Sequence, residues 1–213
     1  MGNYRKMSTG RKTNNVDQFM TSNFTEEFRT VDLLIKSKAI TCGVDAFALS
    51  LIKAERQIRK LFTNLIFQYP SFSESDVSGL RKVLFENTNI YFKDFISGIK
   101  ALYPRSIKDL IGPEYADLLK NLLSAIKYRN KIFHGQLTNK ELTHKDFVKI
   151  INEIKQWCEK LANEAQEEFG YDGFGRNSFQ KNTLPIWKKY KIPVSNLNDY
   201  RNFINFRMTN TQI

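Results

Sequence analysis

The sequence predicts an all-α fold, a helical bundle of about five to six helices followed by a basic, aromatic C-terminal extension. Apolar residues recur at three- and four-residue intervals through residues 16–170, as on the buried face of a helix. Runs of alternating apolar and polar residues, which would predict strands, do not recur, and valine is scarce. A chain of 213 residues can bury one good core. We therefore expect a basic, flexible N-terminal arm over 1–15, one helical domain over 16–170 and the extension over 171–213.

Two long apolar stripes predict the first two helices. The first stripe covers residues 24–35, and Ser22 or Asn23 is available as its N-terminal cap. The second covers residues 44–67 and is closed by Pro70.

Shorter elements follow. Residues 73–86 and 89–104 each predict a helix, and the second of these ends at a proline. Ser106 lies three residues before Asp109, which resembles a capping box with Asp in place of Glu and predicts one tight helical turn.

Two further helices complete the predicted bundle. Pro113 suits the first turn of the next helix. Thr143 and Asp146 then begin a long, strongly periodic helix that Gly170 ends. The helix that Pro113 opens has four inward-facing residues: Tyr115, Leu118, Leu122 and Ile126.

The extension interleaves basic residues with aromatic ones, and a short helix is expected near residues 198–206. Phe174, Phe179, Trp187 and Tyr190 could stack on nucleic-acid bases, or they could pack the extension against the bundle or a partner subunit. We favour packing.

The net charge of +11 is unevenly distributed. Nine of the eleven excess positive charges lie in residues 1–15 and 170–213, so the middle of the chain is nearly neutral. Any basic surface for a polyanion is therefore supplied by the tails or is local.

Several kinds of site and location are not predicted. No apolar run is long enough to span a bilayer and no signal peptide is recognisable, so we expect a cytoplasmic protein without a membrane partner. Cys42, Cys158, His134 and His144 lack the close pairing of metal ligands, so neither a metal site nor a cofactor is expected.

The stretch "YRNKIFHG" at residues 128–135 combines an arginine, an asparagine and one of the two histidines. Arg129 falls on the apolar stripe of its helix, where a guanidinium needs an anionic partner or an opening. Asn130 and His134 are four residues apart, so the amide could orient the imidazole, and Gly135 suits a left-handed helix end. Arg129 and His134 diverge by about 140° on a regular helix. On spacing alone, these residues could also be an arginine at the edge of the core and a histidine interacting with the helix dipole.

Arg129, Asn130 and His134, at the end of a helix in an all-α bundle, resemble the motif of the HEPN superfamily. That motif is an arginine, a polar residue, a few variable residues and a histidine. The resemblance covers residues 44–169 and none of the tails. It implies a metal-independent endoribonuclease, acting as a toxin or in antiphage defence, which dimerises so that two copies of the motif meet.

The resemblance also implies a role for each residue. His134 would transfer a proton to or from the ribose 2′-hydroxyl or the leaving oxygen, Arg129 would stabilise charge on the phosphate, and Asn130 would hold the imidazole. Lys127 and Lys131 are candidates for binding flanking phosphates of the RNA.

Two alternatives remain open. One is a non-catalytic HEPN-fold subunit of a toxin–antitoxin or defence complex, with an antitoxin or regulatory partner. The other is a nucleic-acid-binding protein that depends on its basic tails.

Overall fold

A computed structural model describes residues 14–138 and 141–208, with side chains from Asn23 onward. Within these ranges the chain is helical and contains no strand, which confirms the predicted all-α class. Residues 1–13 of the predicted N-terminal arm lie outside the described residues. The long helices are α1 (Asn14–Ile35), α2 (Cys42–Phe67), α6 (Tyr115–Phe133) and α7 (His144–Phe169). The shorter elements are η1 (Glu74–Asp76), α3 (Val77–Glu86), α4 (Phe92–Leu102), α5 (Ile107–Ile111), η2 (Gly112–Glu114), η3 (Ile186–Lys189), α8 (Leu197–Phe203) and the π-helical turn η4 (Ile204–Met208).

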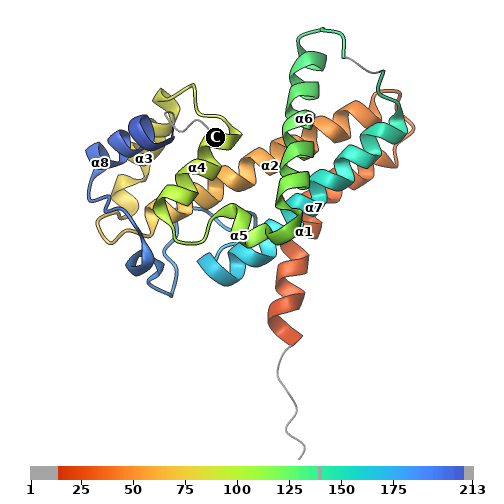
Figure 1. Ribbon diagram of the computed structural model, residues 1–213. Helices are drawn as coiled ribbons and strands as arrows, with labels where there is room; N and C mark the ends of the chain where they lie inside the picture. The colour runs from red at the N-terminus through yellow and green to blue at the C-terminus, as the bar shows by residue number, and fades with distance from the viewer. Residues whose placement is uncertain (1–13, 139–140, 209–213) are drawn as a thin grey trace, which may run out of the picture.

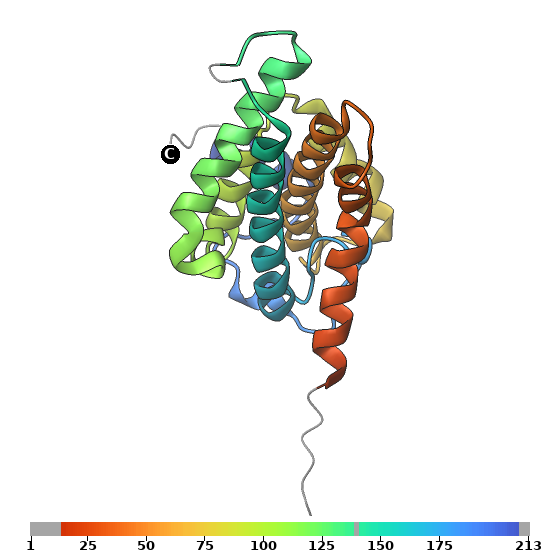
Figure 2. The same cartoon turned by 90° about the vertical axis from the view of Figure 1, so that its right-hand side faces the viewer.

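The four long helices lie side by side in the order α6, α7, α2, α1 (Figure 2). On the other side of α2 lies α4, which η4 covers, and α8 packs against α3. The C-terminal end of α6 and the loop after it project beyond the rest of the described chain (Figure 1). In the described chain, no helix is both long and apolar enough to cross a membrane.

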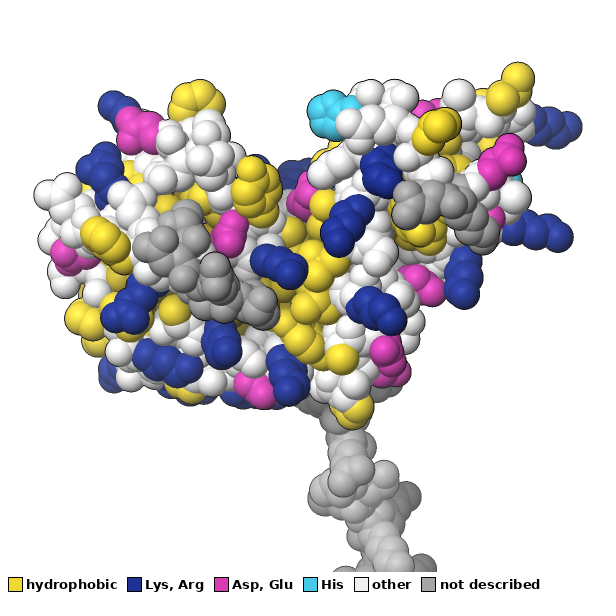
Figure 3. All heavy atoms as spheres, turned by 45° about the horizontal axis from the view of Figure 1, so that its top comes forward, with side chains coloured by type: hydrophobic (Ala, Val, Ile, Leu, Met, Phe, Trp, Pro, Cys, Tyr) yellow, Lys and Arg dark blue, Asp and Glu magenta, His cyan; other side chains and the backbone are white. Residues whose placement is uncertain are grey.

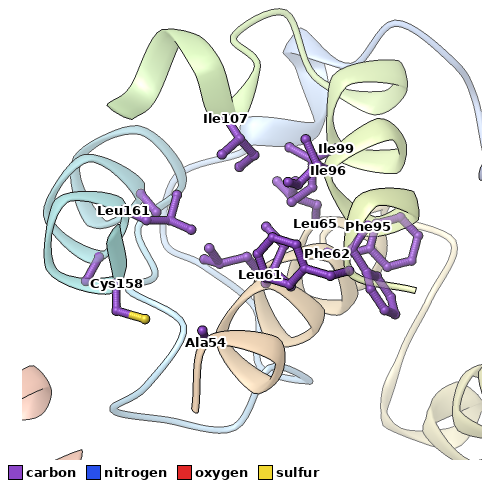
Figure 4. Packing of buried hydrophobic residues seen from close by; sticks show 14 of the residues in the cluster. Ala54, Leu61, Phe62, Leu65, Phe95, Ile96, Ile99, Ile107, Cys158 and Leu161 are labelled. Atoms are coloured by element: carbon purple, nitrogen blue, oxygen red, sulfur yellow. The ribbon is translucent and has the colours of Figure 1, made fainter. Parts of the chain in front are cut away.

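The core is built around the C-terminal half of α2. Side chains of α2, α4, α5 and α7 converge there, among them Leu61, Phe62 and Leu65 of α2 and Leu161 of α7 (Figure 4). All side chains from Leu61 to Tyr69 are buried, so the last two turns of α2 are covered on every face.

The expected helix ends are largely confirmed. Ser106 and Asp109 form the predicted capping box of α5, Thr143 and Asp146 form that of α7, and Gly170 ends α7 with φ at +69°. The predicted start of the first helix was wrong, because α1 begins at Asn14. Asn23 lies within the helix and uses its amide in a tertiary contact instead, donating to Asp172 Oδ2 at 3.0 Å.

The segment after Gly170 is bound to α2 by a row of polar side chains. Gln57, Lys60 and Asn64 lie on one face of α2, with Gln68 at its C-cap, and each donates to a backbone carbonyl oxygen of residues 172–180. The distances are 3.2, 2.8, 3.0 and 3.0 Å in that order. These bonds satisfy carbonyls that no helix or sheet pairs, so irregular backbone can lie against the bundle.

Apolar burial attaches the rest of the extension. Of the four aromatic residues considered for base stacking, Phe174 is buried, Phe179 and Tyr190 are half-buried and Trp187 is exposed. The predicted short helix is present as α8 and η4. Other buried residues of the extension belong to the same core as the bundle: Tyr171, Ile186, Val194, Tyr200, Phe203, Ile204 and Met208.

Glu168 joins three parts of the chain near the end of α7. Its carboxylate accepts hydrogen bonds from Tyr103 at 2.6 Å, Arg105 at 2.7 Å and Lys189 at 3.2 Å. Burial acts to raise the pKa of Glu168, but the hydrogen bonds from these three residues outweigh it and lower the pKa from 4.5 to about 2.

We expect Glu168→Gln to lower the free energy of unfolding by about 1–2 kcal/mol at pH 7, since Arg105 and Lys189 are partly screened by solvent. The folded-state pKa is depressed, so this contribution is present above the unfolded-state pKa. It is lost as the pH falls from about 4.5 to about 2. Urea unfolding of both forms at several pH values would measure it.

Glu164→Gln is the matched control, because within the described part of the chain Glu164 makes only a 3.8 Å ion pair with Arg105 and its side chain is 42% exposed. Its effect should stay within about 0.5 kcal/mol at every pH. An equal loss in the two variants would contradict the assigned role of Glu168.

Candidate active site

The end of α6 has the geometry of a Schellman motif. The Gly135 N–H donates to the Ile132 carbonyl at 3.1 Å and the Gln136 N–H donates to the Lys131 carbonyl at 2.8 Å. Gly135 has φ at +64°, as the sequence predicted. Nothing lies within 4 Å of a Cβ added there, so backbone conformation, not space, favours glycine at this position. The motif places His134 at the C-cap, directly after Phe133, with an exposed side chain.

Glu55 on α2 is the anionic partner of Arg129, which the apolar position of the arginine predicted. Its Nη1 donates to Glu55 Oε2 at 2.8 Å, and both side chains are largely buried, with 21% and 27% exposed. Its Nε and Nη2 donate to the Asn130 Oδ1 at 3.2 and 3.1 Å. These bonds hold the guanidinium plane in place, and Nη1 and Nη2 each keep one N–H for another acceptor.

The expected hydrogen bond between Asn130 and His134 is not formed. The Asn130 amide oxygen accepts from Arg129 instead, and within the described residues the imidazole has no hydrogen-bond partner. The His134 N–H still donates to the Asn130 carbonyl at 3.1 Å, so the backbone is helical up to this residue and only the Asn130 amide is turned, toward Arg129. Asn130 therefore orients the arginine and not the histidine.

Arg129 and Asn130 line a groove with a volume of about 520 Å³ between α2, the start of α4 and α6. Figure 3 shows the surface hollowed between the α4 side and the α6 side, with hydrophobic atoms along the floor. Arg59 and Lys93 add positive charge to the lining, and Asp94 caps α4 by accepting from the Tyr91 backbone N–H at 2.7 Å.

The other predicted site residues lie outside this groove. His134 and Lys127 are exposed on α6 and do not line it. Lys131 is half-buried and already engaged with another group. One chain thus brings Arg129 and Asn130 together and leaves His134 apart, at the projecting end of the helix.

Sequence reasoning missed Glu55 and Arg59. Arg129 lies on the apolar stripe of its helix, which indicated that it needs an acidic partner. The sequence did not indicate which acid, because Glu55 is 74 residues away along the chain. In the sequence, Glu55 and Arg59 were recognisable only as an acidic and a basic residue four positions apart on the second predicted helix.

His144 is the first residue of α7 and is exposed, with its Nδ1 3.9 Å from Cys42 Sγ. It does not line the groove. Within the described residues, no group of three or more His, Cys, Asp or Glu side chains could hold a metal ion.

Comparison with known proteins gives no relative. No protein-family model, no curated protein sequence and no solved structure matches this chain.

We expect the Glu55–Arg129 pair to contribute coupling free energy to folding. Glu55→Ala and Arg129→Ala should each destabilise by about 1–2 kcal/mol, because each leaves a half-buried charge without its partner. The double variant should lose less than the sum of the two, with a coupling of about 1 kcal/mol. Urea unfolding of the four proteins measures this cycle. Additive effects would mean that the contact contributes nothing to stability.

Proposed function

We propose that this protein is a HEPN-type endoribonuclease that cleaves RNA in the cytoplasm without a metal ion, as a toxin or antiphage-defence effector. The observation that carries the proposal is the Arg129 guanidinium. Glu55 and Asn130 hold it in a groove, and two of its N–H groups are left for a phosphate. The resemblance of Arg129, Asn130 and His134 to the HEPN motif supplies the reaction class.

In the proposed reaction, the 2′-hydroxyl oxygen of the ribose attacks the adjacent phosphorus and the bond from phosphorus to the 5′-oxygen breaks. His134 takes the proton of the 2′-hydroxyl or gives a proton to the leaving 5′-oxygen. The products are a 2′,3′-cyclic phosphate and a 5′-hydroxyl. Arg129 stabilises the negative charge that builds up on the non-bridging oxygens. Glu55 and Asn130 are positioning residues, which fix the plane of the guanidinium.

A homodimer is part of the proposal, because one chain leaves His134 outside the groove. Phe133 is 66% exposed and Leu137 is 92% exposed, on either side of His134 at the projecting end of α6. Exposed apolar side chains of this size favour a contact with another protein surface. A second copy that covers them would bring its own His134 close to the groove residues of its partner.

One observation favours the alternative of a non-catalytic HEPN-fold binding subunit. Glu55 neutralises Arg129, and Asn130 does not orient the imidazole. In that case the motif would stabilise the end of α6, and an antitoxin or other partner would cover the exposed apolar residues. Growth on induction separates the two functions. A ribonuclease should be toxic in a way that His134→Ala removes, whereas a binding subunit should behave the same in both forms.

We expect the purified protein to cleave total RNA in the presence of EDTA and to leave 2′,3′-cyclic phosphate ends. His134→Ala should lower the rate by about 10²- to 10⁴-fold, because proton transfer is lost. His144→Ala is the matched control and should cleave as wild type does. Cleavage that requires a divalent ion, or equal loss in the two histidine variants, would reject the proposed chemistry.

A mixed dimer tests whether the site is shared. Homodimers of Arg129→Ala and of His134→Ala should both be inactive. Their heterodimer still has an intact Arg129 on one chain and an intact His134 on the other, so it should recover part of the activity. Co-expression with two different tags would isolate it. A folded heterodimer without activity would contradict a site built from one residue of each subunit.

A further inference from the structure

A second pocket continues the groove on the side away from α6. Its volume is about 520 Å³, and it lies between α2, α3, the α3–α4 loop and the extension. Arg59, Ile90 and Phe95 line both this pocket and the Arg129 groove, so the two are adjacent and share these side chains. Glu55, Arg59 and Thr63 follow it at intervals of four residues, about 6 Å per step along the helix.

The charge of the second pocket is positive. Arg59, Lys60 and Arg81 line it, and none of its lining residues is acidic. Neither Arg59 nor Arg81 forms an ion pair with a carboxylate of the described residues. The Lys60 ammonium donates to the Phe174 carbonyl oxygen at 2.8 Å. Burial lowers its pKa and Arg56 lowers it further, whereas Glu27 and Asp172 act to raise it. An anion entering this pocket would therefore meet mainly Arg59 and Arg81, with no acidic side chain among the lining residues.

Aromatic rings accompany the arginines. The Arg59 guanidinium carbon lies 5.8 Å from the centre of the Phe95 ring, and that of Arg81 lies 5.2 Å from the Phe179 ring. Phe85 also lines the pocket and is 83% exposed. Four small polar residues complete the lining: Thr63, Asn87, Thr88 and Ser178. Cations beside flat rings and small polar groups suit a nucleotide, whose phosphate binds arginine and whose base stacks on an aromatic ring.

We propose that this pocket binds one nucleotide of a single-stranded RNA whose neighbouring phosphate lies at Arg129. The assignment of RNA as the ligand rests on the proposed function, whereas the preference for a nucleotide rests on the pocket. Arg59 lies at the junction and contacts the phosphate between the two positions. Arg81 contacts the next phosphate, and Phe85 stacks on the base. A single strand fits better than a duplex, because in a duplex the bases are not free to stack on a side chain.

The test measures binding of a fluorescein-labelled single-stranded RNA of twelve nucleotides by anisotropy, in a His134→Ala background so that the probe stays intact. Phe85→Ala should weaken binding by about fivefold or more, because one stacked base is lost. Arg81→Gln should also weaken it and should reduce the salt dependence by a slope of about 0.7, the value for one phosphate contact. Phe85→Trp should retain binding.

Lys82→Gln is the matched control on the same helix. Lys82 is exposed and does not line the pocket, and among the described residues it forms only a 3.8 Å ion pair with Glu86. Lys82→Gln removes one positive charge, as Arg81→Gln does. If both substitutions lowered the RNA affinity equally, binding would depend only on the net charge of this surface, and the proposal would be overturned. Thermal melting checks that every variant is folded, which is expected because Arg81 and Phe85 are exposed.

Competition distinguishes the possible ligands. Adenosine monophosphate should compete far more weakly than unlabelled single-stranded RNA, and a double-stranded RNA of the same length should compete poorly. Tighter binding of the free nucleotide, equal binding of the duplex or no binding of the labelled RNA would each overturn the proposal.

Failure of the proposed function gives a different pattern. If the wild-type protein cleaves no RNA while binding depends on Arg81 and Phe85 but not on Lys82, the ribonuclease proposal fails and this one stands. If the wild-type protein cleaves RNA while Arg81→Gln and Phe85→Ala bind and cleave as wild type does, the pocket is not part of the RNA path.

Discussion

The complete burial of the last two turns of α2, Leu61–Phe67, is the constraint on which the rest of the structure depends. A helical segment that is buried all round must be covered on every face, and here α4, α7 and the extension share that task. The cover includes irregular backbone, whose carbonyls need partners. Gln57, Lys60, Asn64 and Gln68 supply the donors from α2 itself. The segment after Gly170 is therefore part of the folded unit and not an appendage to it.

The candidate site lies on the part of α2 that other elements do not fully cover. Glu55 lies on α2 before the fully buried segment Leu61–Phe67 and is left partly open between α4 and α6, where it contacts Arg129. The pair has two opposing effects. It fixes the guanidinium in one orientation, and it cancels the charge that would attract a phosphate. Arg59, one turn further along α2 and without a carboxylate partner in the described residues, restores a positive potential to the groove.

Folding produces a local basic surface in a part of the chain whose net charge is nearly zero. The middle of the sequence is nearly neutral, yet folding gathers Arg59, Lys60 and Arg81 around one pocket that lacks an acidic lining residue. A ribonuclease with this arrangement would bind its substrate through the groove as well as through its basic tails. The exposed end of α6, with His134 between Phe133 and Leu137, lies apart from these basic residues. In the proposed dimer, this is the surface that a second copy would cover.

The sequence by itself determined the all-α class and most helix boundaries, because periodic apolar stripes, capping boxes and helix-ending glycines act over a few residues. The capping boxes at Ser106 and Thr143 and the left-handed glycines at positions 135 and 170 are examples. It also showed that Arg129 needs an acid, since a charge on an apolar stripe cannot remain unpaired. Only the tertiary structure decided that the acid is Glu55, that Asn130 binds Arg129 instead of His134, and that the first helix begins before the cap expected for it. Those outcomes depend on which distant helices pack together, and the spacing of residues along one helix carries no information about that.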